Sequence, residues 1–215
     1  MGNTVAGVER ERVTTVSWKA DASSLYAPNG ARKYLNHAER QRALGAMTLL
    51  KFDQALFALT LAWTGARVSE ILALTPASFQ LECGTVAIQT LKRRKHCVRE
   101  VPIPPALMTE LDRHFGIALA QRNLESAHRR LWPWCRSTAW RIIKRVMHQS
   151  GITGSHACPR GLRHAFGVGT LQASVPITLV QRWLGHARLS TTAIYVDASG
   201  PEETAFAKRF WEAAA

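Results

Sequence analysis

The stretch over residues 159–195 gathers side chains that could hold and attack a phosphate. Cationic or proton-carrying groups and one phenol follow one another on consecutive predicted helices, namely Arg160, Arg163, His164, His186 after Gly185, and Tyr195. Arginine supplies several permanently charged donors, histidine carries a proton near neutral pH, and tyrosine can act as a nucleophile. Each group alone also has an ordinary structural explanation, because Gly-His often ends a helix and tyrosine often belongs to a core. Their combination predicts a phosphate site.

A further arginine, Arg67, follows a run that predicts a helix buried on every side. The run DQALFALTLAWT begins at Asp53 and is apolar nearly all round the helix. Thr64-Gly65 ends it, so the arginine that comes next must lie near the core. Two interpretations remain open, because Arg67 could pair with Glu70 three residues later or could join the phosphate site.

The remaining pattern predicts a mainly α domain with one small antiparallel β-hairpin or sheet. Asn36 and Glu39 have the spacing of a capping box, and residues 85–90 and 98–103 resemble two strands. Pro105 suits the first turn of a helix, and residues 123–134 are expected to form a loop. Further helices are expected over about 137–150, which Ser137 would cap, and over about 159–172, 176–184, 190–196 and 202–214.

The charge balance points to a polyanionic partner. Lys and Arg number 28 against 15 acidic residues, which gives a net charge of +13, and basic groups gain affinity for phosphates by releasing counterions. The predicted hairpin carries a cationic tip: Lys92, Arg93, Arg94, Lys95 and His96. The predicted helix over 137–150 carries what we call the basic stripe: Arg141, Lys144, Arg145 and His148. Both sets could be solvated surface or a DNA-binding face, but the stripe has none of the acidic partners expected of a solvated helix.

Several classes of protein are disfavoured. No apolar run reaches transmembrane length, and the first residues lack the apolar core of a signal peptide. The four cysteines, Cys83, Cys97, Cys135 and Cys158, have no Cys-x-x-Cys spacing, so we expect free thiols in a reducing cytoplasm. His156 and Cys158 have no second ligand pair at metal-binding spacing, so we expect no metal site there.

Four motifs in the same order resemble the catalytic boxes of the tyrosine recombinase (phage integrase) family. They are TGARVSE, GLRH, WLGHA and TTAIY, and the resemblance covers about residues 35–211. It implies the fold of that family's catalytic domain and an enzyme that cuts and rejoins DNA through a 3′-phosphotyrosyl link, without a metal or another cofactor. The implied catalytic residues are Arg67, Lys92 (with Lys95 as the alternative lysine), Arg163, His186 and Tyr195, with Arg160 completing the phosphate cradle.

This sequence departs from the family pattern at Arg160. The family usually has a histidine there, three residues before the second arginine. Arginine can hold a phosphate, but it stays protonated and cannot act as a base. His186 is then the better candidate for handling the proton of Tyr195.

The resemblance also predicts the domain organisation. We expect a flexible arm over residues 1–31 and a catalytic domain over 32–215, without the usual N-terminal core-binding domain. The predicted helix over 202–214, with Phe206, Phe210 and Trp211, would dock onto a neighbouring protomer on DNA, giving a tetramer when two sites are paired.

Three functions remain open. The leading hypothesis is a site-specific recombinase that acts in integration, excision, inversion or plasmid-dimer resolution. A topoisomerase-like nicking-closing enzyme would use the same residues without pairing two sites. A DNA-binding regulator would keep the fold without catalysis. The arginine at position 160 and the missing core-binding domain favour it, whereas Tyr195 with both arginines argues against it.

Overall fold

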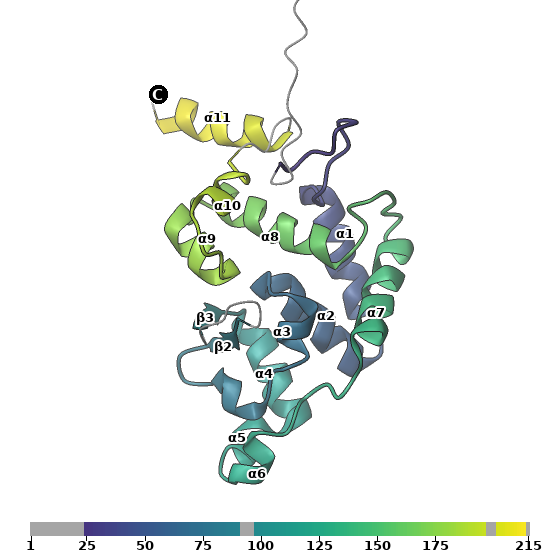
Figure 1. The fold of residues 1–215 in the computed structure, drawn as a ribbon, viewed down its shortest axis with the longest axis vertical. Helices are drawn as coiled ribbons and strands as arrows, with labels where there is room; N and C mark the ends of the chain where they lie inside the picture. The colour runs from purple at the N-terminus through teal and green to yellow at the C-terminus, as the bar shows by residue number, and fades with distance from the viewer. Residues whose placement is uncertain (1–23, 91–96, 197–200, 214–215) are drawn as a thin grey trace, which may run out of the picture.

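A computed structural model of the chain describes residues 24–90, 97–196 and 201–213 (Figure 1). Its helices are α1 (His37–Thr48), α2 (Phe52–Thr64), α3 (Val68–Ile71), the 3₁₀ helix η1 (Pro76–Ser78), α4 (Pro105–Phe115), α5 (Ile117–Ala120), α6 (Leu124–Ala127), α7 (Arg136–Gln149), α8 (Pro159–Gln172), α9 (Ile177–Leu184), α10 (Ser190–Ala193) and α11 (Pro201–Ala213). Its strands are β1 (Phe79–Gln80), β2 (Thr85–Gln89) and β3 (Val98–Pro102). The mainly helical architecture with a small antiparallel sheet is therefore confirmed.

Helix α2 lies at the centre of the main core, as its apolar sequence predicts. It packs against α1, α4, α7 and α8 (Figure 1). Its two buried hydroxyls, on Thr60 and Thr64, donate to the carbonyls of Leu56 and Thr60 one turn earlier, so no polar group of these side chains is left without a partner. Gly65 ends the helix with a left-handed φ of 59°, which places the following arginine beside the core.

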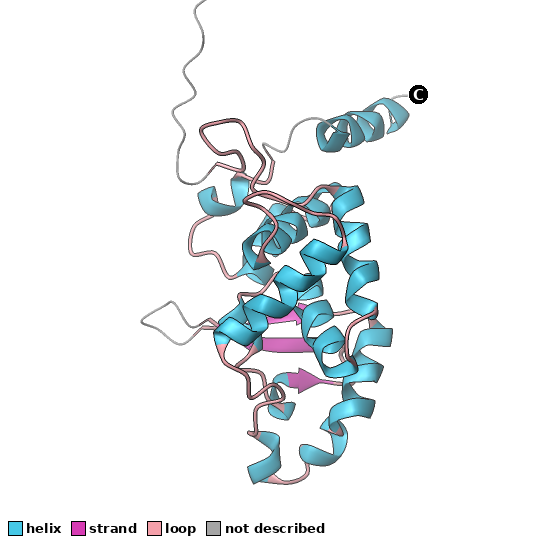
Figure 2. Cartoon of the chain, turned by 90° about the vertical axis from the view of Figure 1, so that its right-hand side faces the viewer, coloured by secondary structure: helices cyan, strands magenta, loops and turns pink. Residues whose placement is uncertain are grey.

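The sheet has the order β1-β2-β3 with antiparallel pairing, and it lies against the helices (Figure 2). Val86 pairs with Val101, and Ile88 pairs with Arg99. Side chains alternate between the two faces of a strand, and the face that carries these residues is buried. The predicted strands are confirmed, whereas the cationic tip over residues 91–96 lies outside the described residues.

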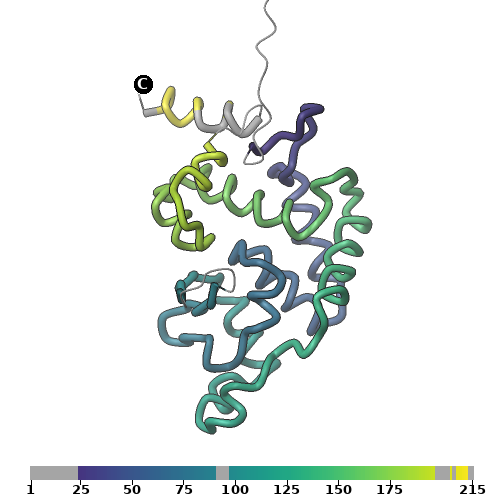
Figure 3. The backbone as a smooth tube through the Cα atoms, viewed as in Figure 1, coloured from purple at the N-terminus to yellow at the C-terminus, as the bar shows by residue number. Residues whose placement is uncertain are grey.

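A second cluster of buried side chains joins the start of the described chain to α8, α9 and α10. It contains Leu25, Tyr34, Phe166, Val168, Leu171, Val180, Leu184 and Tyr195. Figure 3 shows the segment before α1 at the same end of the molecule as α10 and α11. The described part of the predicted flexible arm is thus partly built into the fold, because Leu25 is buried there.

Two further expectations are corrected by the local structure. The predicted loop over 123–134 contains the short helix α6, which Asn123 caps by accepting from two backbone N–H groups. Helix α7 begins at Arg136, one residue before the predicted cap Ser137, and Cys135 takes the N-cap position. Among the described residues, no helix is both long enough and apolar enough to cross a membrane.

Candidate active site

Arg67 forms the ion pair with Glu70 that one of the two sequence interpretations predicts. Its backbone N–H and its Nη1 donate to the two carboxylate oxygens of Glu70, at 2.9 and 2.8 Å. The Glu70 side chain is fully buried, but 28% of the Arg67 side chain remains exposed. The ion pair therefore orients Arg67 without burying it, and the guanidinium can still be reached by an anion.

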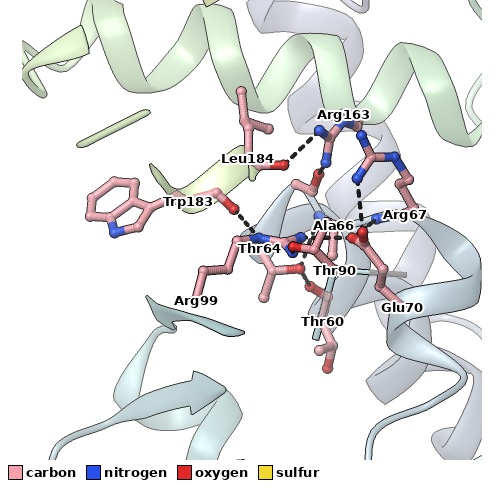
Figure 4. Close-up of polar contacts among 11 residues, drawn as sticks. Thr60, Thr64, Ala66, Arg67, Glu70, Thr90, Arg99, Arg163, Trp183 and Leu184 are labelled. Carbon is pink, nitrogen blue, oxygen red and sulfur yellow. Dashed lines mark hydrogen bonds and ion pairs between the residues drawn. The ribbon is translucent and has the colours of Figure 1, made fainter. Parts of the chain in front are cut away.

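A second arginine, Arg99 of β3, holds Glu70 from the other side. Its Nη2 donates to Glu70 at 2.6 Å, its Nη1 to the hydroxyl of Thr90 at 2.9 Å, and its Nε to the carbonyl of Trp183 at 2.7 Å (Figure 4). Only 4% of Arg99 is exposed. Burial raises the pKa of Glu70, but the charge of Arg99 and the hydrogen bonds from both arginines outweigh it, so the pKa lies below its usual value. Arg99 of β3 is thus hydrogen-bonded both to Glu70 on α3 and to the backbone near the end of α9.

Arg99 was not among the predicted site residues, although the sequence contains a signal for it. In the strand pattern of residues 98–103, Arg99 falls on the same face as Val101 and Ile103. A charged residue on the inward face of a strand requires a buried partner. Glu70 is that partner.

Arg163 joins the ends of two helices that are far apart in the sequence. Its Nη1 donates to the carbonyl of Gly65 after α2, at 2.6 Å, and its Nη2 to the carbonyl of Leu184 at the end of α9, at 2.7 Å. Figure 4 shows its guanidinium next to that of Arg67. Burial, and then the charge of Arg67, lowers the pKa of Arg163 to about 10, so it stays protonated at neutral pH. No described carboxylate forms a salt bridge with Arg163, and two adjacent cations of this kind favour an anion.

His186 follows Gly185, which ends α9 with a left-handed φ of 67°. A Cβ at Gly185 would lie 3.1–3.2 Å from the side chain of Arg99, so glycine allows the helix end to approach the buried arginine. His186 Nδ1 lies 2.9 Å from the hydroxyl of Thr192. Burial, followed by the charges of nearby cations, lowers the pKa of His186 to about 3, so the ring is neutral at pH 7.

Tyr195 lies in the second cluster with 1% of its surface exposed. The rings of His186 and Tyr195 are nearly parallel, with centroids 6.1 Å apart and planes at 16°. A Cβ at Gly167 would lie only 2.6–2.7 Å from atoms of the tyrosine ring, so the ring occupies the space above this glycine. The hydroxyl lies 3.2 Å from Nδ1 of His164. Burial raises the pKa of the phenol, and the charges of Arg163, then of Arg67 and Arg160, oppose that rise.

The other predicted site residues lie elsewhere on α7 and α8 or outside the residues that the structure describes. Arg160 is exposed on the first turn of α8, one turn before Arg163. Lys92, Arg93, Arg94 and Lys95 lie outside the described residues. In the basic stripe on α7, Arg141, Arg145 and His148 are exposed. The fourth member, Lys144, is partly buried and donates to the carbonyl of Ala157 at 2.9 Å.

Comparisons with known proteins show the family to which the chain belongs. Residues 33–200 match the phage integrase family model. The chain is 31% identical over 175 residues to the tyrosine recombinase XerA of Pyrococcus furiosus, covering 78% of this chain and 58% of that protein. It is 34% identical over 149 residues to the tyrosine recombinase XerD of Shewanella oneidensis, covering 66% of this chain and 48% of that protein. The chain thus spans about half to three-fifths of the length of these curated relatives.

Solved structures show the same fold. A crystal structure of XerA recombinase superposes with a TM-score of 0.64 at 23% identity, covering 83% of this chain and 62% of that one. The pre-cleavage complex of the XerH site-specific recombinase with its difH substrate gives a TM-score of 0.65 at 21% identity, covering 86% of this chain and 59% of that one. The predicted fold of a tyrosine recombinase catalytic domain is therefore confirmed.

Proposed function

This chain belongs to the phage integrase family, and we propose that it is a site-specific DNA recombinase with Tyr195 as its nucleophile. Attack of the phenol on a phosphodiester forms a 3′-phosphotyrosyl link and releases a 5′ hydroxyl. The link conserves the energy of the broken bond, so a 5′ hydroxyl from another strand can reverse the step without a cofactor.

One observation carries this proposal: Arg67 and Arg163 lie side by side and their charges act on the phenol of Tyr195. The arginines are fixed by Glu70 and by backbone carbonyls before any ligand arrives. Phosphoryl transfer places additional negative charge on the nonbridging oxygens, and prearranged cations stabilise that charge without reorganising. The two guanidiniums form the phosphate cradle in this proposal.

The remaining catalytic roles follow from residue chemistry. The lysine of the hairpin, Lys92 or its alternative Lys95, protonates the departing 5′ oxygen as general acid. Arg160 lies one turn from Arg163 on α8 and contributes a further donor to the phosphate. His186 stays neutral in its contact with Thr192 and completes the cradle as a hydrogen-bonding group.

The substrate in this proposal is double-stranded DNA, which the basic stripe and the hairpin tip contact. Arg141, Arg145 and His148 are exposed along one side of α7, and a major groove admits a single helix. Lys144 donates to a backbone carbonyl, so we assign it a smaller share of the phosphate contacts than its exposed neighbours.

Self-association on paired sites, as a tetramer, is the last part of the proposal. Helix α11 contacts the body of the protein through Arg209, whose Nη1 donates to the hydroxyl of Ser174 at 2.9 Å. Phe210 and Trp211 are 73% and 58% exposed. Beside α8 lies a mostly apolar cavity of about 740 Å³ lined by residues such as Trp63 and Trp183, and by Arg209 of the chain's own α11. We propose that on paired sites α11 of a second copy replaces the chain's own helix at this cavity, with its exposed aromatic residues as anchors.

The test is covalent capture of DNA. Short duplexes with a randomised central segment and a nick are incubated with the full chain, and complexes that survive denaturant are recovered and sequenced. We expect an enriched sequence and an adduct on Tyr195, with no adduct from Tyr195→Phe. A wild-type protein that binds duplex DNA but never forms an adduct would contradict the proposal and favour the regulator.

The products then separate the two enzymatic hypotheses. With the enriched sequence in two plasmids, a recombinase yields joined or exchanged circles, whereas a nicking-closing enzyme yields only relaxed circles. Removal of residues 201–215 should leave binding to a single site intact but abolish cooperative occupation of paired sites in a gel-shift titration.

A further inference from the structure

The hydroxyl of Tyr195 has a histidine neighbour that the family motifs do not assign. Nδ1 of His164 lies 3.2 Å from the phenol oxygen, and the two rings are 5.7 Å apart at 55°. His164 is held on α8 directly after Arg163, while the tyrosine follows α10. No other described side chain forms a hydrogen bond with this hydroxyl.

The alternative proton acceptors are less suitable. Arg160 occupies the usual histidine position, and a guanidinium has no lone pair that can accept a proton. His156 interacts with Glu39 instead. The ring of His186 lies nearly parallel to the phenol with the centroids 6.1 Å apart, and among the described contacts it forms no hydrogen bond with the phenol oxygen. Its Nδ1 is also bonded to Thr192.

We propose that His164 is the catalytic residue that takes the proton from Tyr195 during strand cleavage and returns it during rejoining. This inference rests on the recombinase function proposed above. His164, the residue after Arg163, then supplies the base that Arg160 cannot be.

The step balances in protons and bonds. The phenol oxygen forms a bond to phosphorus while its proton moves to Nδ1 of His164, which carries its other proton on Nε2 and becomes an imidazolium. The bond from phosphorus to the 5′ oxygen breaks, and that oxygen takes a proton from the hairpin lysine. In rejoining, a 5′ hydroxyl attacks the phosphorus and gives its proton to the lysine, and the imidazolium returns its proton to the phenol.

The charges around His164 make this base dependent on the substrate. The groups facing it are Arg160 and Arg163 on its own helix, Lys33 from the segment before α1, and Tyr195 with His186 across the site. Burial, and then the three cations, lowers the pKa of His164 to about 4, so its lone pair is available at neutral pH. The same cations disfavour an imidazolium until a phosphate brings negative charge beside them. Proton transfer is thereby favoured when DNA is bound.

The experiment measures single-turnover adduct formation on the captured duplex. His164→Gln keeps a hydrogen-bonding side chain that cannot be protonated, and it should lower the rate by about 10²–10⁴-fold while DNA affinity stays unchanged. His186→Gln is the matched control, because His186 is also a buried histidine beside the phenol, and it should keep the acid limb of the pH–rate profile that His164→Gln removes. Added imidazole should partly restore His164→Ala.

A leaving-group substitution separates the base from the acid. A duplex whose 5′ bridging oxygen is replaced by sulfur has a leaving group that departs without protonation. It should rescue loss of the hairpin lysine in Lys92→Ala or Lys95→Ala, but it should not rescue His164→Gln. Rescue of His164→Gln by the sulfur substrate would overturn the assignment as base.

The remaining outcomes are also decisive. If the His164→Gln variant forms the adduct at a rate within about threefold of wild type, the inference is overturned. A wild-type adduct in the same assay would still support the recombinase function. No wild-type adduct overturns both. If the glutamine variant does not fold, His164 is replaced by triazolylalanine, which keeps the ring shape but is less basic. A lower rate with an acid limb moved to lower pH supports the inference, and an unchanged profile overturns it.

Discussion

The buried pair of Glu70 and Arg99 makes a strong prediction about stability. Arg99→Met removes the charge but keeps an unbranched apolar side chain of similar reach. It leaves a fully buried carboxylate whose remaining charged partner is Arg67. Removing one member of a buried ion pair costs about 3–5 kcal/mol. For a domain of this size, that corresponds to a fall in Tm of about 6–20 °C.

The assay is urea unfolding of the full chain followed by circular dichroism, with Arg113→Met as the matched control. Arg113 pairs with Glu110 three residues earlier on α4, and both side chains of this pair are exposed. Loss of that pair should cost at most about 1 kcal/mol. Adding Glu70→Leu to Arg99→Met should recover part of the loss, because the unpaired carboxylate is removed. Equal effects of Arg99→Met and Arg113→Met would refute the reasoning.

Three further predictions concern the phenol, the histidines and the DNA face. Gly167→Ala places a methyl group against the ring of Tyr195 and should destabilise the protein by about 1–3 kcal/mol in the same urea assay. Gly169→Ala is the control, because a Cβ at Gly169 meets nothing within 4 Å, and it should be neutral or stabilising. Burial lowers the pKa values of His164 and His186 to about 4 and 3, so the unfolded chain binds protons at these histidines at a higher pH than the folded chain does. The free energy of unfolding should therefore be at its full value above pH 6.5 and fall as the pH is lowered from there through those values. His186→Gln should flatten this acid limb in thermal unfolding scans, and an unchanged limb would contradict the assignment. Arg141→Ala should reduce the slope of log affinity against log salt concentration by about one unit, measured by fluorescence anisotropy on a duplex, and an unchanged slope would leave this residue as solvated surface.

Much of the fold could be predicted because its patterns are strong and local. The run that became α2 is apolar on every side, so it could only be a central helix. The capping box of Asn36 and Glu39 forms as its spacing predicts, and Gly65 and Gly185 end their helices with left-handed backbones. These features depend on residues within a few positions of each other.

The contacts that complete the site depend on tertiary packing. Arg99 and Glu70 are 29 residues apart and meet because β2, the strand that pairs with β3, packs against α3. His164 and Tyr195 are 31 residues apart, and their contact depends on how α10 packs against the other helices. No periodicity in the sequence encodes such a distance. The two interpretations of Arg67 could not be separated from sequence because they are compatible: the ion pair with Glu70 leaves 28% of the Arg67 side chain exposed.

The short connection between the nucleophile and the last helix limits the geometry of any assembly. Tyr195 and Pro201, the first residue of α11, are six positions apart, and six residues span at most about 20 Å even when fully extended. The Cα atom of Pro201 must therefore stay within that distance of the Cα atom of Tyr195, wherever the helix docks. If α11 enters the cavity of a second copy, that cavity can lie no farther from Tyr195 than the connection plus the length of α11, which is about 20 Å for its 13 residues. The connection and the helix together therefore limit the spacing between neighbouring protomers on DNA.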